Sequence, residues 1–537
     1  MKQKNTEKTA KNEIKTTKIP EKSQKQQKSA KDEQKTVDFI SQIKNCFDEE
    51  SKIEVVDYSI AQNNVSVFFI ECLIDKKMLS SAVLSPLEKL NFSSGEQNKD
   101  FASLVKTTIS AVGSVTEMTE KQQVLDAILS GSAVVVMSDK AYSCSVFSAE
   151  KRSPEEPPTS RVIKGPREGF VEDIYTNLGL VRKRIKSQDL KQKEVFIGKR
   201  TNTRVTLVYL KGIAKQDIVD EVERRLKSVD IDGVIDSYYV EQFLEADNLK
   251  FVRRVGNTEK PDIFCAKILE GRVGIIVDGS PIALTVPFIL FEDLQSSEDY
   301  YTIPAMATFG RIMRLCGLIF AMIIPGIYVA LQSFNYRILP INFLISLLSS
   351  IEGLSIPPLI EILVVLLLFE VITEASLQMP NSLGMALSII GALALGNTAV
   401  DAGIISPPSI VVVAVSSVAL YIIPDQISET RLLRIIFTLA GGIIGLYGLM
   451  TSFMILMAYL SSIRSFGVPF FTPYAPSVKE DKKDGFIKKD LQSMKTRPKL
   501  ISGENNTRQR INSQSGKDII QKGKIKGGYQ WQLDNFT

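Results

Sequence analysis

The stretch "LCGLIFAMIIPGIYVALQSFNY", residues 315–336, contains 22 consecutive residues without a charged side chain. A helix of this length spans the roughly 30 Å of hydrocarbon in a lipid bilayer. Pro325 lies inside the stretch, where proline removes a backbone hydrogen bond and kinks a helix, so Pro325 is a candidate gating position as well as a structural kink. From this point the composition is that of a membrane protein.

Further apolar segments follow the first one. They are residues 357–377, 382–400, 404–423 and 432–460. Together with residues 315–336 they predict an all-α polytopic membrane domain over residues 301–476, with about five hydrophobic segments. Residues 341–356 are also apolar, but this stretch is short and contains Glu352.

Basic residues predict the orientation of this domain. Arg311 and Arg314 precede the first segment, and the N-terminal residues have no apolar run of the signal-peptide kind, so the large N-terminal part is expected in the cytoplasm. Arg464 and the basic C-terminal residues also favour the cytoplasm, which requires an even number of crossings. Because five is odd, either residues 341–356 also cross or one segment is re-entrant.

The preceding residues, 37–300, alternate strand-like and helix-like patterns and predict α/β tandem subdomains. A Pro-rich, charged linker at residues 149–166 divides them into subdomain 1, residues 37–148, and subdomain 2, residues 167–300. "ILSGSAVVVMSD", residues 128–139, is similar to "ILEGRVGIIVDG", residues 268–279: each is a helix end, a glycine and a β run. Either the two subdomains are related, or these are two unrelated helix-to-strand joins.

Both ends of the chain are rich in lysine. Residues 1–36 hold eleven Lys against five acidic residues, and residues 477–537 hold fourteen Lys or Arg against seven. Such tails are expected to be solvated and disordered, although they could touch anionic lipid or nucleic acid. No nucleic-acid-binding fold is indicated.

The composition excludes several kinds of catalytic and metal site. The chain has no histidine, which removes Ser-His-Asp and Cys-His catalysis and His-ligated zinc. Its five cysteines are scattered without a CxxC pair, and the P-loop, GxGxxG and GxSxG signatures are absent. The sequence therefore predicts a protein that is not an enzyme and has no cofactor and no metal site.

The strongest functional signal is an acidic block inside the membrane domain. Between Ile338 and Thr430 there is no Lys or Arg in 93 residues. The same interval holds the acidic residues Glu352, Glu361, Glu370, Glu374, Asp401, Asp425 and Glu429. Membrane carboxylates are costly and must face a partner, a water-filled cavity or a pore.

Helical spacing divides these acids. Glu370 and Glu374 are four residues apart and share a face, whereas Glu361 lies about half a turn away. Repeated in a symmetric oligomer, the first two would form carboxylate rings that attract cations. The candidate cation pathway therefore consists of Glu370, Glu374, Glu361 and Asp401.

A structural role for these acids stays open. A buried carboxylate could instead bind the backbone or an arginine of a neighbouring helix. The flanking candidates for such a partner are Arg314, Arg337, Arg431 and Arg434. Gly441 and Gly445 form a GxxxG pattern that predicts close helix packing.

Several long motifs resemble one family. "KGPREGFVEDIYTNLGLVRKRI", "GRVGIIVDGSPIALTVPFILFEDLQSSEDYY", "PPLIEILVVLLLFEVITEASLQMP" and "RSFGVPFFTPYAP" resemble, in order and spacing, the A subunit of GerA-type nutrient germinant receptors of bacterial spores. The resemblance runs from about residue 37 to 476. It implies a cytoplasmic two-part N-terminal domain, and a membrane domain in the inner membrane of the spore.

The resemblance also implies partners and an activity. Such A subunits act with a transporter-like B subunit, thought to sense the nutrient, and a lipoprotein C subunit. Copies of the A subunit are thought to form a nutrient-gated cation channel whose opening starts germination. By the same resemblance, Glu361 and Glu370 fall on acidic positions of the family's proline-led helix, and Glu374 falls on its "EA" step. Leu366 and Thr373 stand where relatives often carry an acidic and a basic residue.

Two other functions remain as alternatives. In a signalling scaffold, the membrane part would only anchor the chain, and neutralising the membrane acids would have little effect beyond assembly. In a transporter-like subunit that binds the nutrient itself, this chain alone would bind the nutrient saturably, and weak inverted repeats are expected.

Overall fold

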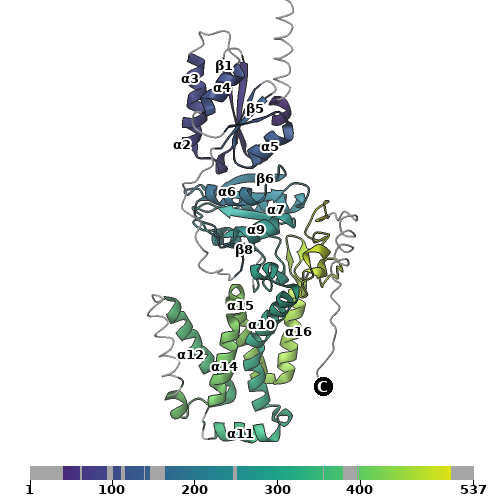
Figure 1. The fold of residues 1–537 in the computed structure, drawn as a ribbon. Helices are drawn as coiled ribbons and strands as arrows, with labels where there is room; N and C mark the ends of the chain where they lie inside the picture. Colours follow the sequence, from purple (N-terminus) through teal and green to yellow (C-terminus); the bar gives the residue numbers. More distant parts are fainter. Residues whose placement is uncertain are drawn as a thin grey trace, which may run out of the picture. The chain divides into compact units, whose positions relative to one another are not determined.

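The computed structural model describes residues 40–60, 63–92, 101–110, 115–137, 140–145, 164–245, 251–352, 354, 356–378, 396 and 398–509. Residues 1–36, most of the linker at residues 149–166, most of the segment at residues 382–400 and residues 510–537 lie outside these ranges. The chain forms two compact units, shown in Figure 1. The first is Met1–Ser153 with Arg182–Leu190, and the second is Pro154–Val181 with Lys191–Thr537.

The first unit is built on a five-stranded sheet of order β1-β2-β4-β5-β3. Its strands are β1 (Ile53–Ile60), β2 (Asn63–Ile70), β3 (Val115–Met118), β4 (Ala133–Met137) and β5 (Lys140–Cys144). Every pair of neighbouring strands in this sheet is antiparallel. All five residues of β4 are buried because helices cover both faces of the sheet.

Alternate residues of β4 contact different helices. Val135 belongs to a core with residues of α3 (Ser85–Phe92) and α4 (Phe101–Ser110), whereas Val134 and Val136 pack with α5 (Lys121–Leu129). This two-sided burial explains why the strand is a continuous apolar run.

The second unit contains a sheet with the corresponding order β6-β7-β9-β10-β8. Its strands are β6 (Leu190–Ile197), β7 (Thr203–Leu210), β8 (Gly256–Thr258), β9 (Val273–Val277) and β10 (Ala283–Val286), and its helices include α6 (Ile174–Arg184), α7 (Gln216–Lys227), α8 (Ser237–Leu244) and α9 (Pro261–Leu269). The similar sequence stretches lie at corresponding places: α5, Gly131 and β4 in one unit, α9, Gly271 and β9 in the other. Both glycines have positive φ, 89° and 105°, as a left-handed helix end requires.

A group of helices follows the second sheet. These are α10 (Pro304–Ser333), α11 (Ile341–Ile351), α12 (Pro358–Gln378), α14 (Pro407–Leu420), α15 (Ile427–Ile444) and α16 (Leu446–Ser462). The prediction that residues 432–460 form one segment is therefore wrong, because the helix ends at Gly445 and a second helix, α16, follows it. That residue has a φ of 72°, which a right-handed helix cannot continue.

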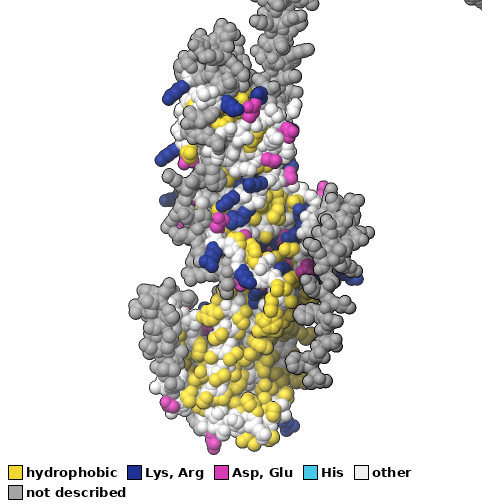
Figure 2. All heavy atoms as spheres, viewed as in Figure 1, with side chains coloured by type: hydrophobic (Ala, Val, Ile, Leu, Met, Phe, Trp, Pro, Cys, Tyr) yellow, Lys and Arg dark blue, Asp and Glu magenta, His cyan; other side chains and the backbone are white. Residues whose placement is uncertain are grey.

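The apolar character of this helical part is visible on its surface. Figure 2 shows hydrophobic side chains gathered over these helices, while charged side chains lie mainly over the sheet-containing parts. Among the described residues, α10 is the one helix long and apolar enough to cross a membrane. The pair Pro407–Leu420 and Pro424–Ile444, bent by 111°, would add a second if it counts as one span. α11 and α16 are apolar but shorter.

Residues 464–509 return to the second sheet. They contain β11 (Arg464–Ser465), β12 (Val468–Pro469), η8 (Asp481–Lys483) and η9 (Leu491–Ser493). Ile501 and Met494 are buried, and the Gly503 amide donates to the Ile213 carbonyl at 2.7 Å. The prediction of a disordered tail from residue 477 is therefore wrong for residues 477–509, where a few buried apolar side chains anchor a lysine-rich segment.

Candidate functional site

Glu361 lies in the first turn of α12 and is buried, with 1% of its surface exposed. Its Oε1 accepts hydrogen bonds from the Ser406 amide at 2.7 Å and from the Ser406 hydroxyl at 2.6 Å. The Ser406 hydroxyl is also 2.9 Å from that of Ser409, which donates to Tyr328 of α10. Glu361 therefore joins the start of α12 to the start of α14.

Glu370 is paired with two arginines of α15. Its Oε1 lies 2.5 Å from Nη2 of Arg434, and its Oε2 lies 3.1 Å from Nε of Arg431. The Arg434 side chain is 2% exposed, and its Nη1 also donates to Ser417 at 3.1 Å. The structure thus gives Glu370 the arginine partner that the sequence left open, and its charge is balanced within the chain.

Glu374 faces another direction. It is exposed, and its Oε1 accepts a hydrogen bond from Gln378 at 3.1 Å. Its exposed neighbours along the helix are Ile360, Leu367, Val371 and Gln378, which recur every three, four or seven residues and so form one stripe on α12. We call these five residues the open stripe of α12. Glu370 lies beside the stripe, so Glu370 and Glu374 differ in environment despite their spacing.

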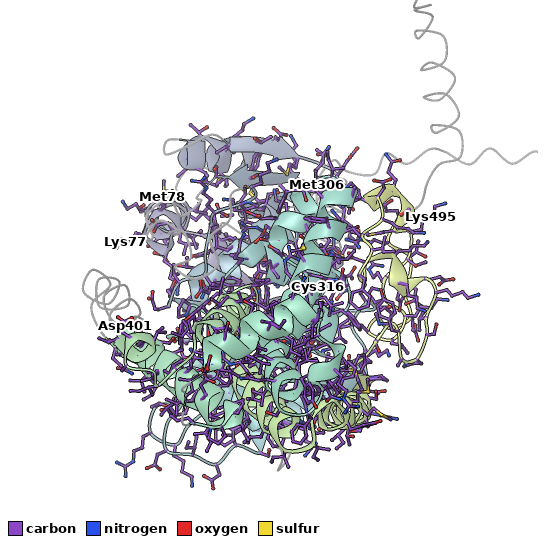
Figure 3. The ribbon with its side chains drawn as sticks, turned by 90° about the horizontal axis from the view of Figure 1, so that it is seen from below. Lys77, Met78, Met306, Cys316, Asp401 and Lys495 are labelled. Atoms are coloured by element: carbon purple, nitrogen blue, oxygen red, sulfur yellow. The ribbon has the colours of Figure 1, made fainter. Side chains whose placement is uncertain are left out.

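Asp401 is exposed, and Figure 3 places it at the outer edge of the helical part, away from Cys316 of α10. Within one chain, the structure therefore does not bring the four candidate acids together. Among the described residues, Glu361 and Glu370 contact neighbouring helices, whereas Glu374 and Asp401 are exposed.

The proline and glycine positions lie at a close helix crossing. Pro325 is buried inside α10, which continues through it to Ser333. A Cβ atom on the next residue, Gly326, would lie 2.7 Å from the Phe437 carbonyl of α15, and one on Gly441 would overlap the Gly326 carbonyl. Gly441 therefore packs against α10, whereas Gly445 ends α15 and lies beside Phe334 and Asn335.

A polar junction that the sequence analysis missed joins the sheet of the second unit to α15. Arg253 donates to Asp293 and lies 3.7 Å from Asp425, and Gln426 donates to Asp293 at 2.6 Å. The Arg253 side chain is 11% exposed and that of Asp293 is 4% exposed. Asp425, counted above among the membrane acids, thus meets a cation 172 residues earlier in the chain. The adjacent pair Arg253 and Arg254, in a segment that is otherwise partly apolar, was the available signal.

Glu241 of α8 lies close to this junction and is 9% exposed. Burial raises the pKa of its carboxyl to about 7, and the nearby charges of Glu245, Glu429 and Asp425 act in the same direction against the opposing effect of Arg253. A carboxyl therefore titrates near neutral pH where the sheet meets α15.

Comparisons with known proteins identify the family. The model of the Bacillus/Clostridium GerA spore germination protein family matches residues 41–500. The chain is 32% identical to spore germination protein KA of Bacillus subtilis (strain 168), over 83% of this chain and 82% of that one. It is 33% identical to spore germination protein GerLA of Bacillus cereus, over 82% of this chain and 90% of that one.

A solved structure is also similar. The crystal structure of the N-terminal domain of the A subunit of the Bacillus megaterium spore germinant receptor GerK3 is 30% identical in sequence. It covers 47% of this chain and 95% of that one, with a TM-score of 0.37. On the family match and the relatives, this chain belongs to the GerA family of spore germination proteins, as a GerA-type A subunit.

Proposed function

We propose that this chain is the A subunit of a nutrient germinant receptor in the inner membrane of the spore, and that copies of it form a nutrient-gated cation channel whose opening starts germination. In this proposal the helical part is the membrane domain and the two sheets lie on the cytoplasmic side. The B and C subunits of the same receptor are its partners. The role is non-enzymatic.

The open stripe of α12 carries the proposal. Ile360, Leu367 and Val371 are 51%, 63% and 58% exposed, so this face lacks a partner among the described residues of the chain. A stripe made only of these residues could face lipid. Glu374 and Gln378 continue it, however, and carboxylates of membrane helices almost always face the interior of a helix bundle or a water-filled cavity. The stripe is therefore better suited to a water-filled path lined by several copies of the chain.

The order of residues along the stripe fits an ion path. Glu370 contacts the first turns of α15, and this end of α15 adjoins the junction of Arg253 and Asp425. Glu374 lies one turn further along α12. A ring of Glu374 carboxylates would concentrate cations at this mouth, and rings of Leu367 and Val371 deeper in the path would form an apolar constriction that can exclude water.

Glu361 and Glu370 have a positioning role in this proposal. Their contacts to Ser406, Arg431 and Arg434 hold the inner face of α12 against α14 and α15. They thereby fix which face of α12 stays open. This assigns to Glu374 the ion-facing role that the sequence gave to Glu370 and Glu374 together.

Nutrient-triggered potassium release from spores tests the proposal. Spores carrying Glu374→Gln are compared with wild type and with Glu352→Gln, which removes an exposed carboxylate of the same acidic block outside the stripe. Immunoblots establish equal subunit levels. We expect Glu374→Gln to slow release or to reduce its preference for cations, and Glu352→Gln to behave as wild type.

Unchanged release in Glu374→Gln, at a normal subunit level, would contradict the pathway. That result would favour a scaffold in which α12 only anchors the chain.

A further inference from the structure

We propose that an apolar cavity between α10, α15 and α16 binds a small uncharged molecule that carries one aromatic ring. The cavity has a volume of about 230 Å³ and lies inside the second unit. Fifteen of its twenty lining residues are apolar. Engineered apolar cavities of about 150 Å³ stay dry and bind benzene, so the volume and the lining of this cavity suit a ligand of that kind.

The cavity runs along the helices that surround it. On α10 its lining extends from Leu315 to Met322, and on α16 it extends from Phe453 to Leu460. In both helices the lining residues recur at intervals of three, four and seven, so each helix turns one apolar stripe toward the cavity. Each stripe covers about 10 Å of helix, which leaves room for a ring along the helix axis.

The polar residues of the lining lie at the end of the cavity that adjoins the second sheet. Arg253 pairs with Asp293, and the side-chain amide of Gln426 donates to the same carboxylate at 2.6 Å. A charged ligand would have to displace one of these groups or lose its hydration without compensation. Glu429, also in the lining, is half-buried and repels anions. This end of the cavity therefore favours an uncharged ligand.

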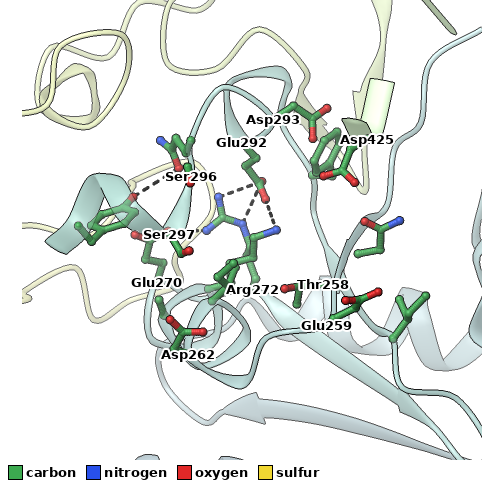
Figure 4. Close-up of a pocket in the computed structure, with 18 of the residues that line it drawn as sticks. Thr258, Glu259, Asp262, Glu270, Arg272, Glu292, Asp293, Ser296, Ser297 and Asp425 are labelled. Carbon is green, nitrogen blue, oxygen red and sulfur yellow. Dashed lines mark hydrogen bonds and ion pairs between the residues drawn. The ribbon is translucent and has the colours of Figure 1, made fainter. Parts of the chain in front are cut away.

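A second cavity shows the contrast. Arg253 and Asp293 also line this polar cavity, which has a volume of about 300 Å³. Figure 4 shows Arg272 directed at Glu292 in its wall, where the two side chains are 3.0 Å apart. The polar cavity therefore has charged walls, whereas the cavity between the helices offers mainly apolar contacts.

Aromatic and sulfur-containing side chains narrow the class of ligand further. Phe291 makes edge-on ring contacts with Phe471 and Phe486, with ring centroids 6.3 Å and 4.8 Å apart. Aromatic pairs gain stability beyond the area that they bury, and thioether sulfur atoms contact aromatic rings favourably. An aromatic ring therefore fits this lining better than a saturated ring of equal size. The phenylalanines and methionines of the lining are Phe291, Phe453, Phe471, Phe486, Met322 and Met457.

The cavity also adjoins the contacts that position α12. Leu433 of its lining precedes Arg434 in α15, and Arg434 and Arg431 contact Glu370 of α12. A ligand in the cavity therefore packs against the turns of α15 that hold Glu370.

Photolabelling of the purified full-length chain in lipid nanodiscs tests the site. The probe is a phenyl(trifluoromethyl)diazirine, which is one aromatic ring with a photoreactive group, and mass spectrometry identifies the labelled peptides. Labelling of side chains that face lipid rises in proportion to the probe concentration, whereas labelling at a site of limited capacity saturates. We expect saturable labelling of α10 and α16 at their cavity-lining residues. Labelling of α14, where Val418 is 70% exposed, should rise in proportion.

Competitors of similar size test the class of ligand. Toluene should suppress the saturable labelling at concentrations at least tenfold lower than benzoate or benzylammonium, which add a negative or a positive charge to the same ring. At equal concentration in the lipid, methylcyclohexane should compete about threefold less well than toluene. Equal competition by either charged compound would overturn an uncharged ligand, and equal competition by methylcyclohexane would overturn an aromatic one.

Two neighbouring residues of α15 provide a matched pair of variants. Leu433 lines the cavity, whereas Leu432 is 45% exposed. Leu433→Trp fills the cavity and is expected to abolish the saturable labelling, and Leu432→Trp should be labelled as wild type is. If thermal unfolding shows that Leu433→Trp does not fold, Ile319→Trp fills the cavity from α10 instead.

Two results would overturn the inference. One is labelling that rises in proportion to the probe concentration at every site, which a lipid chain in the cavity would produce. The other is saturable labelling that persists in both Leu433→Trp and Ile319→Trp. Because no ion flux is measured, either result leaves the proposed channel to its own test.

Discussion

Replacing Glu370 by glutamine removes the carboxylate that balances two arginines. Arg434 is 2% exposed in its side chain, so it cannot recover water when its partner loses charge. Breaking one partner of a buried pair costs about 3–5 kcal/mol of unfolding free energy. Because the Glu370 side chain keeps 27% exposure and a glutamine oxygen still accepts one hydrogen bond, we expect about 2–3 kcal/mol for Glu370→Gln.

The matched control is Glu374→Gln, one turn further along α12. Its carboxylate is exposed and makes only the hydrogen bond from Gln378 among the described contacts. A surface substitution of this kind changes the unfolding free energy by no more than about 0.5 kcal/mol. The two variants therefore make the same chemical change, with a large expected difference in stability.

The assay is equilibrium unfolding of the purified chain in detergent, extended to a double-mutant cycle with Arg434→Gln. We expect the double variant to lose less unfolding free energy than the two single variants lose in total, by about 1 kcal/mol or more. The reason is that removing both charges leaves neither of them buried without its partner. Wild-type stability in Glu370→Gln, or a coupling below about 0.5 kcal/mol, would refute the reasoning. If such a stable variant also slowed potassium release, Glu370 would face ions rather than Arg434.

Three further outcomes are expected. The Glu241 carboxyl, with an ordinary pKa of 4.5 and a folded-state pKa of about 7, holds a proton that the unfolded chain releases between these values, so stability falls as the pH rises through this window. The midpoint temperature of thermal unfolding should therefore fall less steeply with rising pH in Glu241→Gln than in wild type. Arg311→Met removes a fully buried guanidinium, which we expect to cost about 3–5 kcal/mol, and limited proteolysis should then cut residues 477–509 faster. Gly441→Ala places a methyl group against Gly326 and should destabilise the chain by about 1–3 kcal/mol. In the control Gly403→Ala the added methyl group meets no atom within 4 Å, so this variant tests only the backbone strain at a φ of 64°.

Local patterns predicted the sheets better than the site. The run around Val134 is apolar at every position because both of its faces are covered, and the glycine before it needs positive φ; both properties are visible in neighbouring residues. The corresponding run at Val273–Val277 follows the same rules, so the repeat could be found from sequence. The strand order of each sheet depends on contacts between distant residues and could not be predicted from the sequence.

The environment of each acid depended on contacts between distant residues. Glu370 and Glu374 are one helical turn apart, so the sequence assigns them the same environment. Their environments differ because Arg434, 64 residues after Glu370, contacts Glu370. Gly445 fits a packing motif and a helix end equally well, and the geometry of the following turn decides between them. In residues 477–509 the many lysines concealed the few apolar residues, such as Ile501, that anchor the segment.

The return of the C-terminal segment also sets an order of events during synthesis. Arg311 is buried and donates to the Gly485 carbonyl at 2.6 Å, a partner 174 residues later in the chain. At roughly 5–20 residues per second, the ribosome adds that partner roughly 10–35 seconds after Arg311. Until then the first turns of α10 have Asp299 but lack the backbone acceptors that complete their site. The second unit is therefore finished only after translation has passed residue 485, and any chain cut short before that point leaves the buried Arg311 guanidinium without these backbone acceptors.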